Sequence, residues 1–166
     1  RHFPAINWLT SYSLYTDSLS GWFEKNVSPE WNANRSRMML ILQEEAELEE
    51  IVKLVGMDAL SPSDRLKMET ARSIREDFLH QLAFHEVDTH TSLKKQDLMM
   101  KVILDYYEKA SGALQMNADI EALVSLPVRE KIGRFKYVVE DEIDTEYASI
   151  ESRLAHELAE VLTKED

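Results

Sequence analysis

The segment His85-Glu86-Val87-Asp88-Thr89-His90 holds the residue types that bind metals or exchange protons. A helical zinc-protease site needs histidines at positions i and i+4, which share one face of the helix. Here the spacing is five residues, so the two imidazoles would lie about 140° apart around a helix. The pattern therefore disfavours a zinc site, and we expect no metal ligands in this chain.

Other catalytic signatures are missing as well. The sequence has no G-x-x-x-x-G-K-[ST] phosphate loop and no nucleophile elbow, and no two carboxylates can be paired as acid and base from their spacing. It also has no cysteine, which excludes disulfides and thiolate metal sites. We therefore expect no catalytic residue within these 166 residues.

Composition and charge limit the remaining functional classes. Hydrophobic residues make up 44% of the chain, enough for a folded core. The net charge of −12 disfavours a nucleic-acid partner, which requires lysine and arginine. Residues 138–166 alone carry ten acidic and two basic side chains, which fits a solvated helix face or a docking surface for a basic partner. No apolar run approaches the ~20 residues of a membrane span, so we expect no membrane insertion.

Helical patterns dominate the chain, and no strand pattern persists. A 3.6-residue period indicates long helices over about 35–55, 61–81 and 92–111, a short one through Leu19 and Phe23, and a last one through Ile150 and Leu162. The first long helix should turn an apolar stripe inward and most of its glutamates outward. The stripe is Met38, Met39, Leu42, Ala46, Ile51 and Val55, and the glutamates are Glu44, Glu45, Glu47, Glu49 and Glu50.

Capping residues set the expected helix ends. Gly56 and Gly112 should close the first and third long helices, and Ser61 followed by Pro62 should open the second. Asn117 should cap a short turn that ends near Ser125, and Pro127 should open a further helix. The sequence therefore predicts an all-α helical bundle of about five or six helices with an irregular N-terminal segment.

Aromatic residues crowd the first fifteen positions. Phe3, Trp8, Tyr12 and Tyr15 lie in a stretch that also contains Pro4. Large aromatic side chains favour burial, so we expect this stretch to join the bundle to a further domain of a longer polypeptide. The expected division is residues 1–27 as the end of that domain and the linker, and residues 28–166 as the bundle.

Three stretches carry a resemblance to a known family. The stretch from Arg1 to Trp8 (RHFPAINW), with Ser11 to Leu14 after it, resembles the end of the nucleotide-binding domain in the catalytic A subunit of A-type and V-type rotary ATP synthases. The stretches from Arg75 to Thr89 and from Ser125 to Ile132 are similar to the C-terminal domain of the same subunit. The resemblance covers nearly the whole chain.

The resemblance implies that this domain contributes the adenine side of a nucleotide pocket. It implies adenine contacts from Phe3, Phe84 and Gln81, since an aromatic ring stacks on adenine whatever the phosphates do. Core packing of either ring is the alternative. ATP or ADP with Mg would bind the full-length subunit, whereas the isolated chain should carry no cofactor and should not hydrolyse ATP.

The resemblance also implies a set of partners. These are the nucleotide-binding domain of the same subunit, B subunits in an alternating hexamer, and the central stalk, all in a cytoplasmic sector peripheral to the membrane. The turn from Gly56 to Asp64 aligns with the acidic stalk-contacting loop of related F-type enzymes, but only two of its residues are charged. The candidate stalk contacts are Met57, Asp58, Ala59, Leu60, Ser61 and Asp64.

Three alternatives stay open at this stage. The turn could be a plain connection with an N-cap. The whole chain could be a stand-alone helical interaction module without catalysis. An enzyme acting alone is the third class, which the missing motifs disfavour.

Overall fold

A computed structural model describes residues 7–163 of the chain. The described part is helical and contains no strand, which confirms the predicted all-α class. Five longer helices form its body, and two short helices lie between the last two of them. Their bounds are α1 Thr16–Asn26, α2 Trp31–Val55, α3 Pro62–Ser73, α4 Leu93–Gln115, α5 Ile120–Val124, α6 Val128–Arg134 and α7 Ile143–Thr163.

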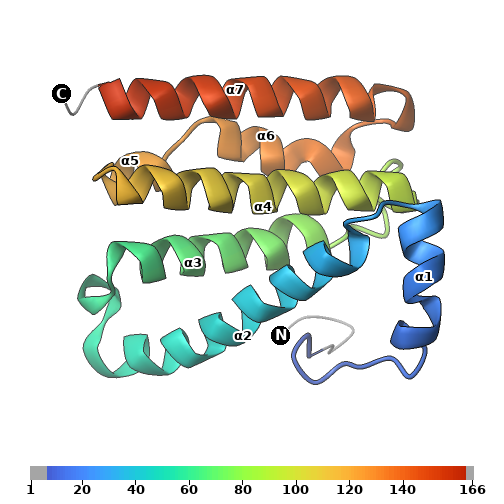
Figure 1. The fold of residues 1–166 in the computed structure, drawn as a ribbon, viewed down its shortest axis with the longest axis horizontal. Coiled ribbons are helices and arrows are strands. Elements are labelled where there is room, and N and C mark those ends of the chain that lie inside the picture. The colour runs from blue at the N-terminus through green and yellow to red at the C-terminus, as the bar shows by residue number, and fades with distance from the viewer. Residues whose placement is uncertain (1–6, 164–166) are drawn as a thin grey trace.

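Helix α4 lies at the centre of the bundle. Figure 1 shows α7 on one side of it and α3, followed by α2, on the other, with α5 and α6 beneath α7. Helix α4 accordingly has the largest buried set of any helix described, including Val102, Ile103 and Tyr106. Helix α1 has no buried residue and contacts α2 through the stacked rings of Phe23 and Trp31, whose centroids are 5.2 Å apart.

Most of the predicted helix ends are confirmed. Gly56 ends α2 with a φ of 86°, a conformation that a residue with a Cβ rarely adopts. The Ser61 hydroxyl accepts a hydrogen bond from the Asp64 amide, and Pro62 occupies the first helical position of α3. Pro127 immediately precedes α6.

Two predicted ends are wrong. Gly112 does not close α4, which continues to Gln115; the chain leaves the helix at Asn117, whose φ is 66°. The cap of the next short helix is Asp119, whose carboxylate accepts from the Ala122 amide, and not Asn117. A glycine within a helix costs about 1 kcal/mol relative to alanine, and the packed face of α4 outweighs that cost.

The stripe and the glutamates of α2 also differ from expectation. Ile51 and Val55 are exposed, at 47% and 62%, because the last turns of α2 extend beyond the core. Glu45 is buried and forms an ion pair with Arg75, whereas it was expected on the outer face. A buried charge is tolerated when it is paired, and here the pair joins α2 to the segment after α3.

One feature distinguishes the middle of the chain. Helix α3 continues without a break into a π-helical turn, η2 (Ile74–Leu79), in which the His80 amide donates to the Arg75 carbonyl at 2.9 Å. The α3–η2 rod starts at the turn after Gly56 and ends at the loop of residues 80–92. These two connections lie at opposite ends of the bundle's long axis (Figure 1).

Candidate functional site

The loop between η2 and α4 presents Phe84 to solvent. The Phe84 ring has a relative exposure of 105%, whereas a phenylalanine normally gains from burial. The structure therefore rules out the alternative that Phe84 is a core residue. Gln81 and Leu82 are exposed on the same loop.

Hydrogen bonds within the loop hold this ring in place. The Leu82 amide donates to Asp88 Oδ2 at 2.6 Å, and the Thr89 hydroxyl donates to the carbonyls of Ala83 and His85, both at 2.7 Å. The His85 Nδ1 atom accepts from the amides of Val87 and Asp88. Residues 82–89 thus form one hydrogen-bonded unit with Phe84 at its outer side.

Two buried lysines lie at the base of the loop. Lys136 Nζ donates to the carbonyls of Glu76 and His80 at 2.8 and 3.1 Å, and these carbonyls belong to the end of η2. Lys95 Nζ donates to the carbonyls of Lys136 and Val138 at 2.7 and 2.6 Å. Burial lowers the pKa of Lys95, and the nearby carboxylates of Glu140 and Asp88 oppose that effect.

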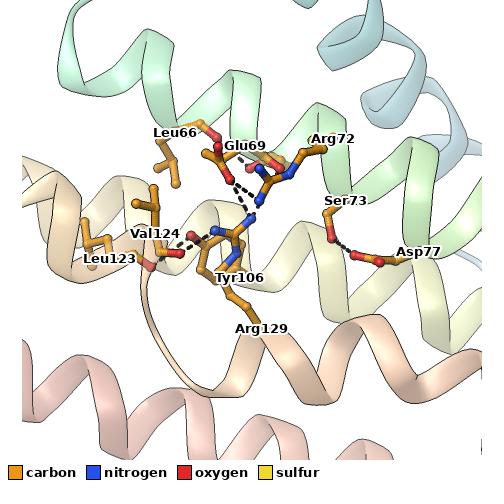
Figure 2. A network of polar contacts seen from close by, with 10 residues as sticks. Leu66, Glu69, Arg72, Ser73, Asp77, Tyr106, Leu123, Val124 and Arg129 are labelled. Carbon is orange, nitrogen blue, oxygen red and sulfur yellow. Dashed lines mark hydrogen bonds and ion pairs between the residues drawn. The ribbon is translucent and has the colours of Figure 1, made fainter. Parts of the chain in front are cut away.

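The π-helical turn is held from two more sides. Arg75 pairs with the buried Glu45 of α2. Asp77 accepts a hydrogen bond from Ser73, one turn earlier, as Figure 2 shows. Burial raises the pKa of Asp77, although Ser73 and the charge of Lys136 partly oppose the rise. Single π-helical turns are rare and occur often at functional sites.

The chemistry of the exposed loop suits a flat uncharged group. Residues 81–86 contain no lysine or arginine, which are the usual partners of a phosphate. Within residues 7–163, no group of three or more His, Cys, Asp or Glu side chains is placed to hold a metal ion. Phe3, the other predicted adenine contact, lies outside the described residues.

The connection at the opposite end, residues 54–64, we call the tip. Met57, Asp58 and Ala59 form the 3-10 helix η1 and are exposed, whereas Leu60 is half-buried. Leu54 of the last turn of α2 has a relative exposure of 85%. The tip therefore presents apolar side chains more prominently than charged ones.

Ser61 and Asp64 have a local role in the tip. The Ser61 hydroxyl lies 2.6 Å from Asp64 Oδ2 and also accepts from the Asp64 amide. The pair therefore forms the N-terminal cap of α3, as the plain-turn alternative requires for these two residues. Asp58 is then the more accessible charge of the tip.

Sequence reasoning missed part of both surfaces. Leu54 and Val55 were not candidates for the tip, because the helical period indicates where a stripe points and not where the core ends. The lysines at the loop base were missed because a lysine is almost always a surface residue. No feature of the sequence distinguishes Lys95 or Lys136 from the exposed lysines.

The structure thus defines a helical domain with an exposed aromatic loop at one end and an exposed apolar tip at the other. Residues 20–124 match the family described as the C-terminal domain of V and A type ATP synthase, and the chain belongs to that family. This confirms the resemblance found in the sequence.

Similar full-length proteins carry one name. The V-type ATP synthase alpha chains of Acetivibrio thermocellus and Clostridioides difficile are 58% and 56% identical to this chain over 99% of its length. The alpha chain of Thermoanaerobacter pseudethanolicus is 56% identical over 93%. The chain spans 26–28% of the length of these relatives. No helix in the described part of the chain is long and apolar enough to span a membrane.

Proposed function

We propose that this domain forms the adenine side of the nucleotide pocket in the A subunit of a V/A-type ATP synthase. The ring of Phe84 stacks on the base, and Gln81 contacts the adenine edge. Phe3, which precedes the bundle, supplies a second ring. The observation that carries this proposal is a fully exposed phenylalanine held on a hydrogen-bonded loop.

The same proposal assigns the second function to the tip. Apolar tip residues contact the central stalk, and the α3–η2 rod connects that contact to the nucleotide loop. Coupling requires that nucleotide and stalk each favour particular positions of the bundle. In the full-length subunit the cofactor is ATP or ADP with Mg, and the partners are B subunits in an alternating hexamer and the central stalk.

Exposed apolar residues near the start of the chain support contact with further protein. Tyr12, Leu14 and Tyr15 have relative exposures of 83%, 83% and 68%, and Trp22 of α1 has 49%. Such clustering is typical of an interface. We infer that this edge lies against the nucleotide-binding domain, which supplies the phosphate loop. On this view the isolated chain does not hydrolyse ATP.

The substitution Phe84→Ala in the full-length subunit tests the adenine contact. Loss of one stacking face costs about 0.5–1.5 kcal/mol, which weakens ATP and ADP binding roughly three- to twelvefold. Phe84→Tyr keeps the flat ring and should bind almost normally, whereas Phe84→Leu should resemble alanine. Fluorescence titration measures all three.

The control is Met116→Ala, because Met116 is 60% exposed and belongs to neither the loop nor the tip. This variant should bind nucleotide as the parent does. An unchanged affinity in Phe84→Ala would overturn the proposed adenine contact.

A further inference from the structure

Both ends of the Phe84 loop are fastened to one short segment much later in the chain, residues 136–140. At the first end, Lys136 Nζ donates to the carbonyls of Glu76 and His80. At the second end, Glu140 accepts from the Ser92 amide at 3.3 Å and from the Ser92 hydroxyl at 3.0 Å. Ser92 is the N-cap of α4, so this contact fixes the point at which the loop enters that helix.

A third contact reaches the middle of the loop. The ring of Tyr137 lies 4.4 Å, centroid to centroid, from the imidazole of His85. Lys136 Nζ lies 5.5 Å from the centroid of the same tyrosine ring. His85 is the residue next to Phe84, and its Nδ1 atom organises the amides of Val87 and Asp88.

The lysine chain makes this attachment stiff. Lys136 is 8% exposed, and its carbonyl accepts a hydrogen bond from Lys95 Nζ, which is 1% exposed. An ammonium group removed from water must keep its hydrogen bonds, since an unpaired buried charge is expensive. The carbonyls at the end of a helix also need partners, and Lys136 supplies them for η2.

We propose that Lys136 is a positioning residue for nucleotide binding, which acts by setting the direction of Phe84. Because residues 82–89 form one hydrogen-bonded unit, a shift at the loop base moves Phe84 with it. This inference rests on the proposed adenine contact. It adds that the segment just before α7 determines how well adenine binds, without touching the nucleotide.

A double-mutant cycle in the full-length subunit tests the inference. Lys136→Met keeps an unbranched side chain of similar length but removes the donor. It should weaken ATP binding by no more than the roughly three- to twelvefold expected for Phe84→Ala. In the Phe84→Ala background, Lys136→Met should cause no additional loss, because the ring through which it acts is gone. Binding of inorganic tripolyphosphate, which has no base, should stay unchanged in every variant.

The matched control is Lys131→Met. Lys131 is on α6 and donates to Glu146 and Ser149 of α7, away from the loop. The same chemical change there should leave ATP affinity as in the parent. If Lys136→Met does not fold, Glu140→Ala takes its place in the cycle, because Glu140 is exposed and fastens the other end of the loop.

The outcomes separate the two proposals. If Phe84→Ala itself leaves ATP affinity unchanged, the adenine contact is wrong. If Phe84→Ala weakens binding but Lys136→Met does not, or if the two losses multiply, the positioning role is wrong. A loss of tripolyphosphate affinity in Lys136→Met would also overturn it, since that result indicates general disruption.

Discussion

Arg129 and Glu69 form an ion pair that joins α6 to α3, with 3.0 Å between Nη2 and Oε2. Figure 2 shows that Arg129 also donates to the Val124 carbonyl and lies over the Tyr106 ring, 5.3 Å from its centroid. The phenol of Tyr106 donates to the Leu123 carbonyl, and burial raises its pKa to about 12. One guanidinium therefore links α3, α4, α5 and α6.

Replacement of this arginine should be costly. Arg129→Met leaves Glu69 and the Val124 carbonyl short of a partner in a mostly buried site, and we expect a loss of about 2–4 kcal/mol in the free energy of unfolding. The control is Arg134→Met on the same helix, whose ion pair with Glu130 is largely exposed and should contribute less than ~1 kcal/mol. Urea denaturation measures both, and equal losses would contradict the assignment.

Asp105 should make the domain less stable as the pH rises. Burial and a hydrogen bond with Glu151 raise the pKa of Asp105 to about 6, above its ordinary value of 3.8. The folded state then binds this proton more tightly than the unfolded state, so the contribution is present below about pH 4 and is lost as the pH rises through about 6. Asp105→Asn removes the titration and should raise the melting temperature at pH 7 more than at pH 4.

The control for this pH effect is Asp144→Asn. Asp144 is exposed, with 70% of its side chain accessible, and pairs with Lys94. Its replacement should not raise the melting temperature at pH 7. The idea fails if the melting temperatures of Asp105→Asn and the parent change in parallel from pH 4 to pH 7.

Two helical glycines should respond differently to alanine. A Cβ at Gly112 of α4 would meet nothing within 4 Å, so Gly112→Ala should stabilise the fold by about 0.5–1 kcal/mol. A Cβ at Gly133 of α6 would lie 3.0 Å from Asp77 Oδ1, which Ser73 holds by a hydrogen bond. Gly133→Ala should therefore show no gain, and thermal denaturation of both variants distinguishes this outcome from a pure propensity effect.

The tip should contact the stalk mainly through apolar side chains. Leu54 is more exposed than Leu60, so Leu54→Ala and Met57→Ala should reduce the coupling of hydrolysis to rotation more than Asp58→Asn does. Exposed ion pairs contribute about 0–1 kcal/mol and are screened by salt. Single-molecule rotation of assembled complexes measures the coupling.

Crosslinking gives an independent check of the tip. The chain has no cysteine, so a single cysteine at the exposed Ala59 reports on one position. We expect a crosslink to the central stalk in at least one nucleotide state. Absence of that crosslink in every state, with reaction from exposed positions on α7 instead, would place the stalk contact at another part of the bundle.

The sequence was sufficient for the helical architecture because its signals are local. Gly56, Ser61 and Pro62 determine backbone conformation at their own positions, and the predicted ends there are confirmed. Gly112 misled the prediction because the packing of α4 against its neighbours outweighs a local preference.

The candidate surfaces could be predicted only in part. Phe84 was identified through the family resemblance, and its exposure appears only when the chain is folded. The pair of Glu45 with Arg75 and the lysine chain of Lys95 and Lys136 join residues 30 and 41 positions apart. A helical period carries no information about such partners, because it describes one helix at a time.

The π-helical turn gives the length of the chain a role that no single side chain performs. An α-helix rotates by about 100° per residue, so deletion of one residue between Ile74 and Leu79 would convert η2 into ordinary helix and turn everything after it by that angle relative to α3. Composition and charge would scarcely change, yet Phe84 would face a different side of the bundle. In evolutionary terms, the spacing of this segment is under a constraint that substitutions within it do not share, and an insertion or deletion there would separate the two ends of the domain functionally while the helices stayed intact.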